Sequence, residues 1–141
     1  MANPIFPCLW FESQAKEAAT FYCSIFPNSK ITFESPIVVN CELNGQRLMG
    51  LNGGSMFKQS EAVSFVIECK DQAEIDYYWD NLIADGGNES QCGWCKDKFG
   101  VSWQVLPDNM AELMSNPERA ERVTAAFMTM RKLDIEKLNN A

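Results

Sequence analysis

The chain has 141 residues, no histidine and a formal charge of −7, and 46% of its residues are hydrophobic. This length predicts a single domain, residues 1–141, that can bury a sizeable core without metals or disulfides. The acidic balance argues against binding to nucleic acid or to an anionic membrane surface. The lack of histidine excludes Ser–His and Cys–His nucleophile pairs and every imidazole-containing metal site.

The first ten residues, "MANPIFPCLW", have no basic stretch followed by a long apolar stretch, so they do not read as a secretory signal. No apolar run is long enough to cross a bilayer. We therefore expect a cytoplasmic protein with reduced thiols.

Residues 4–54 predict a strand, a helix and three further strands. The aromatic-rich run "PIFPCLWFE" is typical of a buried strand, and the following residues have helical spacing, with Ser13 as the expected N-cap and Pro27 at the end. A short strand is expected at 30–34. The segments 37–43 and 46–53 flank Asn44-Gly45, which predicts a hairpin with a type I′ turn.

Residues 61–107 repeat this order. A buried strand at 62–70 precedes a helix over 71–87 that begins with the capping box Asp71-x-x-Glu74, and a hairpin follows over 91–106. Matching "SQA" at 13–15 with "DQA" at 71–73 supports an internal repeat. We predict an α+β fold in which two βαβββ repeats form curved mixed sheets around a ligand cleft.

The tail, residues 108–141, is predicted to be helical. Asp108 is the expected cap of a first short helix, and Asn116 with Pro117 begins a second one. The last residues are expected to form a short turn with a frayed end. The methionines of the tail are expected to pack or to line a partner surface.

Cys92 and Cys95 form a Cys-x-x-Cys pair in "QCGWCKDKFG". A structural zinc site needs four ligands, and the other four cysteines are scattered singly. Thioredoxin-like chemistry places such a pair at a helix N-terminus, whereas here the pair precedes a hairpin turn. We expect both thiols to be small hydrophobic side chains of a sheet, and Asp97 to cap the backbone of the turn.

The duplicated pattern resembles the vicinal oxygen chelate superfamily, which includes glyoxalase I, bleomycin-resistance proteins and extradiol dioxygenases. The segments "PCLWFESQAKEAATFYCSIFPNS", "NGQRLMGLNGG", "GWCKDKFGVSWQVLP" and "NPERAERVTAAFMTMRKLDIEKL" resemble its PhnB-like branch, often labelled 3-demethylubiquinone-9 3-methyltransferase. One departure is the short link at Ser35-Pro36, where relatives often have a longer loop.

The resemblance implies metal-ligand positions on the first, fourth, fifth and eighth strands. Carried over to this sequence, they fall near Cys8, Gly50, Ser64 and Gln104. Glycine offers no side chain and serine is a poor ligand for a divalent ion, so we expect neither a catalytic metal nor another cofactor.

Five residues are the candidates for ligand binding: Cys8, Trp10, Ser64, Glu68 and Gln104. Trp10 shares a face with Cys8 and either stacks on a planar ligand or belongs to the core. Gln104 is expected to face the cleft, with Trp103 on the opposite side. Glu68 is either a general base in a dry cleft or a solvated strand-end charge.

The favoured hypothesis is a dimeric, metal-free protein that binds a small molecule, with the dimer implied by the resemblance. The first alternative is a metal-dependent glyoxalase-like lyase or isomerase that uses Glu68, Gln104 and Cys8. The second is the methyltransferase activity of the family label, for which the sequence lacks a glycine-rich S-adenosylmethionine loop between a first strand and a helix.

Overall fold

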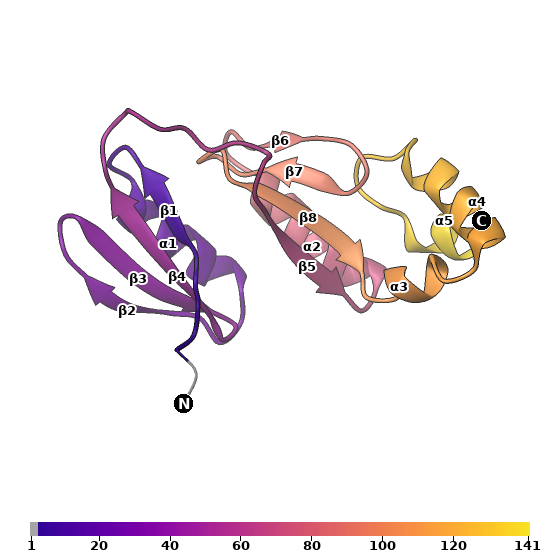
Figure 1. Cartoon of the computed structure of the whole chain (residues 1–141), viewed down its shortest axis with the longest axis horizontal. Coiled ribbons are helices and arrows are strands. Elements are labelled where there is room, and N and C mark those ends of the chain that lie inside the picture. The colour runs from indigo at the N-terminus through magenta and orange to yellow at the C-terminus, as the bar shows by residue number, and fades with distance from the viewer. Residues whose placement is uncertain (1–2) are drawn as a thin grey trace. The chain divides into compact units, whose positions relative to one another are not determined.

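The computed structural model describes residues 3–141 of the chain. They divide into two compact units, Met1–Gln59 and Ser60–Ala141, each of which is described by itself. Each unit contains one four-stranded mixed sheet with a helix on one face (Figure 1).

The first unit contains β1 (Cys8–Phe11), α1 (Ala15–Ile25), β2 (Lys30–Glu34), β3 (Val38–Leu43) and β4 (Gln46–Asn52). Its strand order is β1-β4-β3-β2, with β1 parallel to β4 and the other pairs antiparallel. Asn44 and Gly45 both have positive φ, 49° and 89°, as the predicted hairpin turn requires. Strand alternation turns Leu9, Val39 and Leu48 toward α1, and all three are buried.

One prediction for α1 is corrected. The N-cap position is occupied by Gln14 instead of Ser13, and Gln14 makes no side-chain cap. The Oδ1 atom of Asn52, at the end of β4, accepts the Ala15 N–H at 2.9 Å instead. Its Nδ2 atom donates to the Pro36 carbonyl at 3.1 Å, so one side chain joins the helix start, the short link and the sheet.

The second unit contains β5 (Ser64–Cys69), α2 (Gln72–Ile83), β6 (Asn88–Glu89), β7 (Trp94–Lys96) and β8 (Ser102–Pro107). Its strand order β5-β8-β7-β6 reproduces that of the first unit, with β5 parallel to β8. Asp71 caps α2 by accepting the Glu74 N–H at 2.9 Å, and Glu74 accepts the Lys70 N–H in return. The predicted α+β fold of two βαβββ repeats is confirmed.

The hairpin between β7 and β8 is organised by Asp97, which is 2% exposed. Its Oδ1 atom accepts the N–H groups of Phe99 and Val101, and Oδ2 accepts the indole N–H of Trp103 at 2.9 Å. The predicted cap is confirmed, and so is the burial of Trp103 on the helix side of the sheet.

The Cys-x-x-Cys segment differs from the prediction in one respect. The strand begins only at Trp94, and Cys92 lies in a turn with a φ of 60°. Cys95 is buried in β7, while the Cys92 thiol lies 3.5 Å from the Met128 sulfur. Cys95 is therefore a side chain of the sheet as predicted, whereas Cys92 is not.

The tail contains α3 (Met110–Leu113), α4 (Pro117–Phe127) and α5 (Ile135–Asn139). Asn116 caps α4 as predicted, whereas α3 begins after Asn109 instead of Asp108. The end of the chain is not frayed, because Leu138 is fully buried in a cluster with Leu113, Val123 and Leu133. Met110 and Met130 pack on this cluster, and Met114 and Met128 are exposed.

Gln72 fixes the tail to the rest of the second unit. Its Nε2 atom donates to the Leu133 carbonyl at 3.0 Å, and its Oε1 atom accepts the Ile135 N–H at 2.9 Å. No helix within residues 3–141 has both the length and the apolar character needed to cross a bilayer.

Candidate functional site

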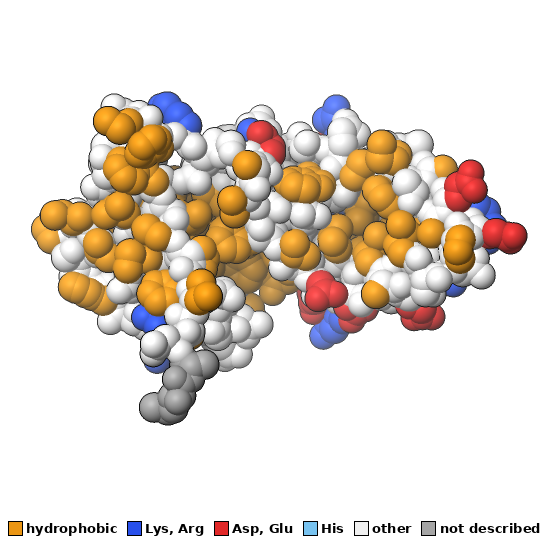
Figure 2. Space-filling model, in the orientation of Figure 1, with side chains coloured by type: hydrophobic (Ala, Val, Ile, Leu, Met, Phe, Trp, Pro, Cys, Tyr) orange, Lys and Arg blue, Asp and Glu red, His pale blue; other side chains and the backbone are white. Residues whose placement is uncertain are grey.

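Each sheet has one face that its own helix does not cover. In the first unit we call it the first open face, and strand alternation assigns to it Cys8, Trp10, Val38, Asn40, Met49 and Leu51. Figure 2 shows hydrophobic side chains gathered over the first unit on the side in view.

Trp10 lies on the first open face, as predicted, and its indole is fixed. The ring N–H donates to the Gly54 carbonyl at 2.8 Å. A Cβ atom at Gly53 would stand 2.4 Å from the Trp10 ring, so the indole occupies the space that a side chain would need there. Phe57 packs edge-on against it with ring centroids 4.9 Å apart, and Phe57 is itself 57% exposed. The half-buried Trp10 and the exposed Phe57 together form an aromatic surface.

Cys8 lies beside Trp10 on the first open face and is exposed. Its register partner on β4 is Met49, while Leu9 pairs with Gly50. Partial burial raises the pKa of the Cys8 thiol above its ordinary value, so the thiol is protonated near neutral pH. Cys8 is therefore a weak nucleophile in this surrounding.

The second open face belongs to the sheet of the second unit. Parallel and antiparallel register bring Val66, Gln104 and Trp94 into one row across β5, β8 and β7. The neighbouring row contains Ser64, Ser102 and Lys96. One polar side chain, Gln104, thus lies between the exposed Val66 and the half-buried Trp94.

The structure brings Ser64 and Gln104 together. Gln104 Nε2 donates to Ser64 Oγ at 2.9 Å, and the Gln104 side chain is half-buried. Within residues 3–141 no donor reaches Gln104 Oε1, and this atom is not sealed from solvent. The hydroxyl of Ser64 retains its own hydrogen for donation. The pair presents one acceptor and one donor beside apolar surface.

Glu68 lies at the end of β5 on the same face, opposite Leu106, and is exposed. Its exposure to water favours the solvated strand-end charge over the general base. Lys96 on the second open face forms an ion pair with Glu61, and this pair lowers the pKa of the Glu61 carboxyl.

The side chains at the expected ligand positions do not fit a divalent cation. Gly50 is the wrong position on β4 for a metal ligand. It faces α1, where a Cβ atom added to it would lie 3.1 Å from the Cβ atom of Ala15. The open-face residue paired with Cys8 is Met49, so β1 and β4 offer a protonated thiol and a thioether. Ser64 on β5 and Gln104 on β8 offer a hydroxyl and an amide. Such donors suit soft or weakly held ions.

No group of three or more Cys, Asp or Glu side chains within the described part of the chain is arranged to hold a metal ion. Of the sequence-derived positions, only Gln104 carries an oxygen that a divalent metal ordinarily takes.

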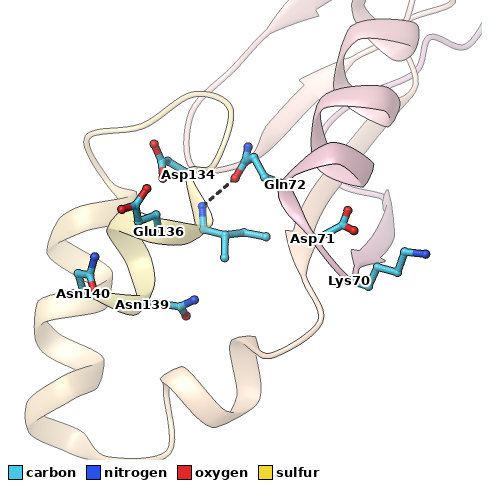
Figure 3. Close-up of a pocket in the computed structure, with 8 residues that line it drawn as sticks. Lys70, Asp71, Gln72, Asp134, Glu136, Asn139 and Asn140 are labelled. Carbon is cyan, nitrogen blue, oxygen red and sulfur yellow. Dashed lines mark hydrogen bonds between the residues drawn. The ribbon is translucent and has the colours of Figure 1, made fainter.

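A separate groove of about 670 Å³ lies where α2 begins and α5 packs (Figure 3). Asp71 and Asp134 are among its lining residues, and both serve as helix caps. Gln72 closes its floor through the bond to the Ile135 N–H drawn in Figure 3. Gln72 holds the tail in place here, and the lining of the groove includes none of the predicted site residues. A second groove of about 530 Å³ in the first unit lies beside the Lys16–Glu34 ion pair.

Sequence reasoning missed Met49 and the contact between Trp10 and the Gly53-Gly54 loop. The signal for Met49 was present, because the Asn44-Gly45 turn fixes the register and the buried Leu48 then leaves Met49 on the other face. No local signal predicted that the glycine pair makes room for an indole.

The comparisons with known proteins agree with this architecture. A PhnB protein from Bacillus cereus, named as a 3-demethylubiquinone-9 3-methyltransferase, is 29% identical, with a TM-score of 0.67 over 74% of this chain and 99% of its own. Protein PA1353 from Pseudomonas aeruginosa is 18% identical, with a TM-score of 0.63 over 76% of this chain and 98% of its own.

The fosfomycin resistance protein FosX from Listeria monocytogenes, solved with Mn(II) and sulfate, shares the fold at 14% identity and a TM-score of 0.62, over 82% of this chain and 97% of its own. No curated protein matches the chain. The family model for 3-demethylubiquinone-9 3-methyltransferase matches residues 3–106. The chain therefore belongs to this PhnB-like family of the vicinal oxygen chelate superfamily.

Proposed function

We propose that this protein binds a small, neutral, partly planar organic molecule without a catalytic divalent metal. In this proposal residues 1–141 form a single domain, and a ligand can use the open face of either sheet. The observation that carries the proposal is the Ser64–Gln104 pair, which offers an acceptor and a donor next to Val66 and Trp94. Small-molecule sites in general combine apolar surface with a few fixed polar groups.

The aromatic surface of Trp10 and Phe57 supports a planar ligand, since exposed aromatic rings offer area for stacking. The protonated Cys8 and the exposed Glu68 do not support nucleophilic or general-base chemistry. Cys8 and Glu68 remain proposed contacts of the ligand through their positions on the open faces.

The experiment is a thermal-shift screen of uncharged aromatic amides, phenols and quinones, with a chelator present throughout. The best compound is then titrated against the native protein, Gln104→Leu, and the control Gln91→Leu, which changes an exposed glutamine outside the open faces. Loss of the Gln104 hydrogen bonds should weaken binding by roughly tenfold, about 1.4 kcal/mol. Equal affinity in all three proteins, or no compound that binds, would count against the proposal.

A second candidate, methylation of a quinone oxygen, is favoured by the name of the matching family model. It requires S-adenosylmethionine, and the residues around Gly53-Gly54 do not fit that cofactor, because the Trp10 ring already fills the space at Gly53. Isothermal titration with S-adenosylmethionine separates the two candidates. Heat that saturates at one cofactor per chain would favour the methyltransferase.

We also propose that the protein acts in the cytoplasm as a homodimer. The exposed apolar side chains of the first unit, which include Phe33, Ile37 and Met56, support an interface between two copies. Light scattering after size exclusion at micromolar concentration tests this, and a mass of one chain would contradict it.

A further inference from the structure

One hydroxyl of the second open face has no hydrogen-bond partner in the described chain. Ser102, the first residue of β8, is 1% exposed, and its Oγ atom bonds to no group within residues 3–141. A buried hydroxyl without a partner costs stability, and such groups are rare in folded proteins. The Ser102 hydroxyl is therefore a group that a ligand could satisfy.

Ser102 lies in a polar row that crosses three strands. It pairs with Ser64 on β5 and with Lys96 on β7. Gln104, two residues further along β8, turns to the same face and donates to Ser64 Oγ. Within residues 3–141 no donor reaches Gln104 Oε1. Two neighbouring side chains of β8 thus offer a donor, the Ser102 hydroxyl, and an acceptor, Gln104 Oε1.

An ion pair crosses β8 at the level of Ser102. Lys96 lies on β7, and its partner Glu61 lies shortly before β5, so the pair joins the strands on either side of β8. The Lys96 side chain is 36% exposed, which fits an apolar stem that lies on the sheet while the ammonium group reaches Glu61. Exposed ion pairs add little stability. The Lys96–Glu61 pair is therefore a cover over Ser102 that opens at little cost.

We propose that Ser102 and Gln104 bind a carboxamide group of the ligand when the Lys96–Glu61 pair opens. The inference rests on the proposed function for the place of the ligand and adds its chemical class. The Ser102 hydroxyl donates to the carboxamide oxygen, and the carboxamide N–H donates to Gln104 Oε1. The rest of the ligand lies on the apolar side chains of the neighbouring row. A ketone can form only the first of these two bonds, so the site prefers the amide.

The cover is tested without a ligand. Ser102→Cys replaces the hydroxyl by a thiol, and trypsin releases it as the only cysteine of peptide 99–119. Iodoacetamide should label this thiol slowly while the ion pair is intact, and about fivefold faster when Glu61→Gln weakens the pair. The control Glu34→Gln weakens the Lys16–Glu34 pair of the first unit and should leave the rate unchanged. Rapid labelling with the Lys96–Glu61 pair intact, or an equally slow rate in Glu61→Gln, would overturn the cover.

The carboxamide is tested with benzamide and with acetophenone, which has a methyl group in place of the amide nitrogen. Isothermal titration should show tighter binding of benzamide by the native protein. Ser102→Ala should weaken benzamide binding by roughly tenfold. Gln104→Leu should remove the preference for benzamide over acetophenone. Without a ligand, Ser102→Ala should not lower the urea midpoint of unfolding, because the hydroxyl that it removes has no partner in the described chain.

Three results would overturn the carboxamide assignment. The first is equal affinity of the native protein and Ser102→Ala for benzamide. The second is a lowered urea midpoint in ligand-free Ser102→Ala, which would show that the hydroxyl serves the fold. The third is no binding of benzamide at all. Binding of other compounds from the thermal-shift screen would in each case leave the proposed function standing.

Discussion

Gln104 Nε2 donates to Ser64 Oγ at 2.9 Å across the parallel strands β8 and β5. The bond fixes an amide and a hydroxyl on the open face of the second sheet, at two of the positions where the resemblance places metal ligands. A hydroxyl already engaged with an amide is a poor ligand for a divalent ion. The same bond orients Gln104 Oε1 as an acceptor for an organic ligand.

The Trp10 indole depends on the absence of a side chain at Gly53. We predict that Gly53→Ala lowers the free energy of unfolding by about 1–3 kcal/mol, because the new Cβ would stand 2.4 Å from the ring. Urea unfolding measures the change. In a Trp10→Ala background the additional cost of Gly53→Ala should vanish, since the clash is gone.

The matched control is Gly54→Ala. Gly54 has a φ of +93° and open space around it, so its cost arises from backbone strain and should persist in the Trp10→Ala background. If Gly53→Ala costs the same in both backgrounds, the clash with the indole is not its cause.

The start of α1 is held by a residue distant in sequence. Asn52→Ala removes the acceptor of the Ala15 N–H and the donor to the Pro36 carbonyl, and should cost about 0.5–2 kcal/mol of stability. Ser13→Ala, at the position that the sequence favours as the cap, should stay within about 0.5 kcal/mol of the native protein. Thermal unfolding measures the stability of both variants. A larger loss in Ser13→Ala than in Asn52→Ala would indicate that Ser13 caps α1.

Buried thiols should make the fold sensitive to alkali. Burial raises the pKa of Cys41, Cys69 and Cys95 from 9.0 to about 12 in each case. Above pH 9 the unfolded chain releases these protons while the folded chain retains them, so the stability present below pH 9 is lost as pH rises toward 12. The slope is at most about 1.4 kcal/mol per pH unit for each thiol.

Urea unfolding with a reductant, at about pH 8 and pH 10, measures the loss. Cys95→Ala should reduce the slope of the free energy of unfolding against pH by the contribution of one thiol. Equal stability of the native protein at the two pH values would contradict the burial argument.

Local patterns were sufficient to predict much of the fold. The Asn44-Gly45 turn set one hairpin, and the capping box of Asp71 and Glu74 set the start of α2. Each signal lies within a few residues, and the internal repeat then extended the pattern from one unit to the other. The positions of Cys8, Trp10 and Gln104 on their strands followed from alternation.

The misses share a physical cause, which is contact between distant segments. Asn52 reaches α1 from the end of β4, and Gln72 binds the tail at Leu133 and Ile135. No window of sequence contains both partners of these bonds. Gly50 is the wrong ligand position on β4, because the register of β1, β3 and β4 turns Met49 instead of Gly50 to the open face opposite Cys8.

Elemental analysis tests the central claim most directly. The untagged protein is measured as purified and after dialysis with zinc, nickel, manganese and iron(II), each followed by gel filtration. Neither the Cys8–Met49 pair of the first unit nor the Ser64–Gln104 pair of the second suits a divalent ion, so we expect no stoichiometric metal in any sample. One tightly held metal ion per chain, lost in Gln104→Leu, would contradict the metal-free account and favour a glyoxalase-like enzyme.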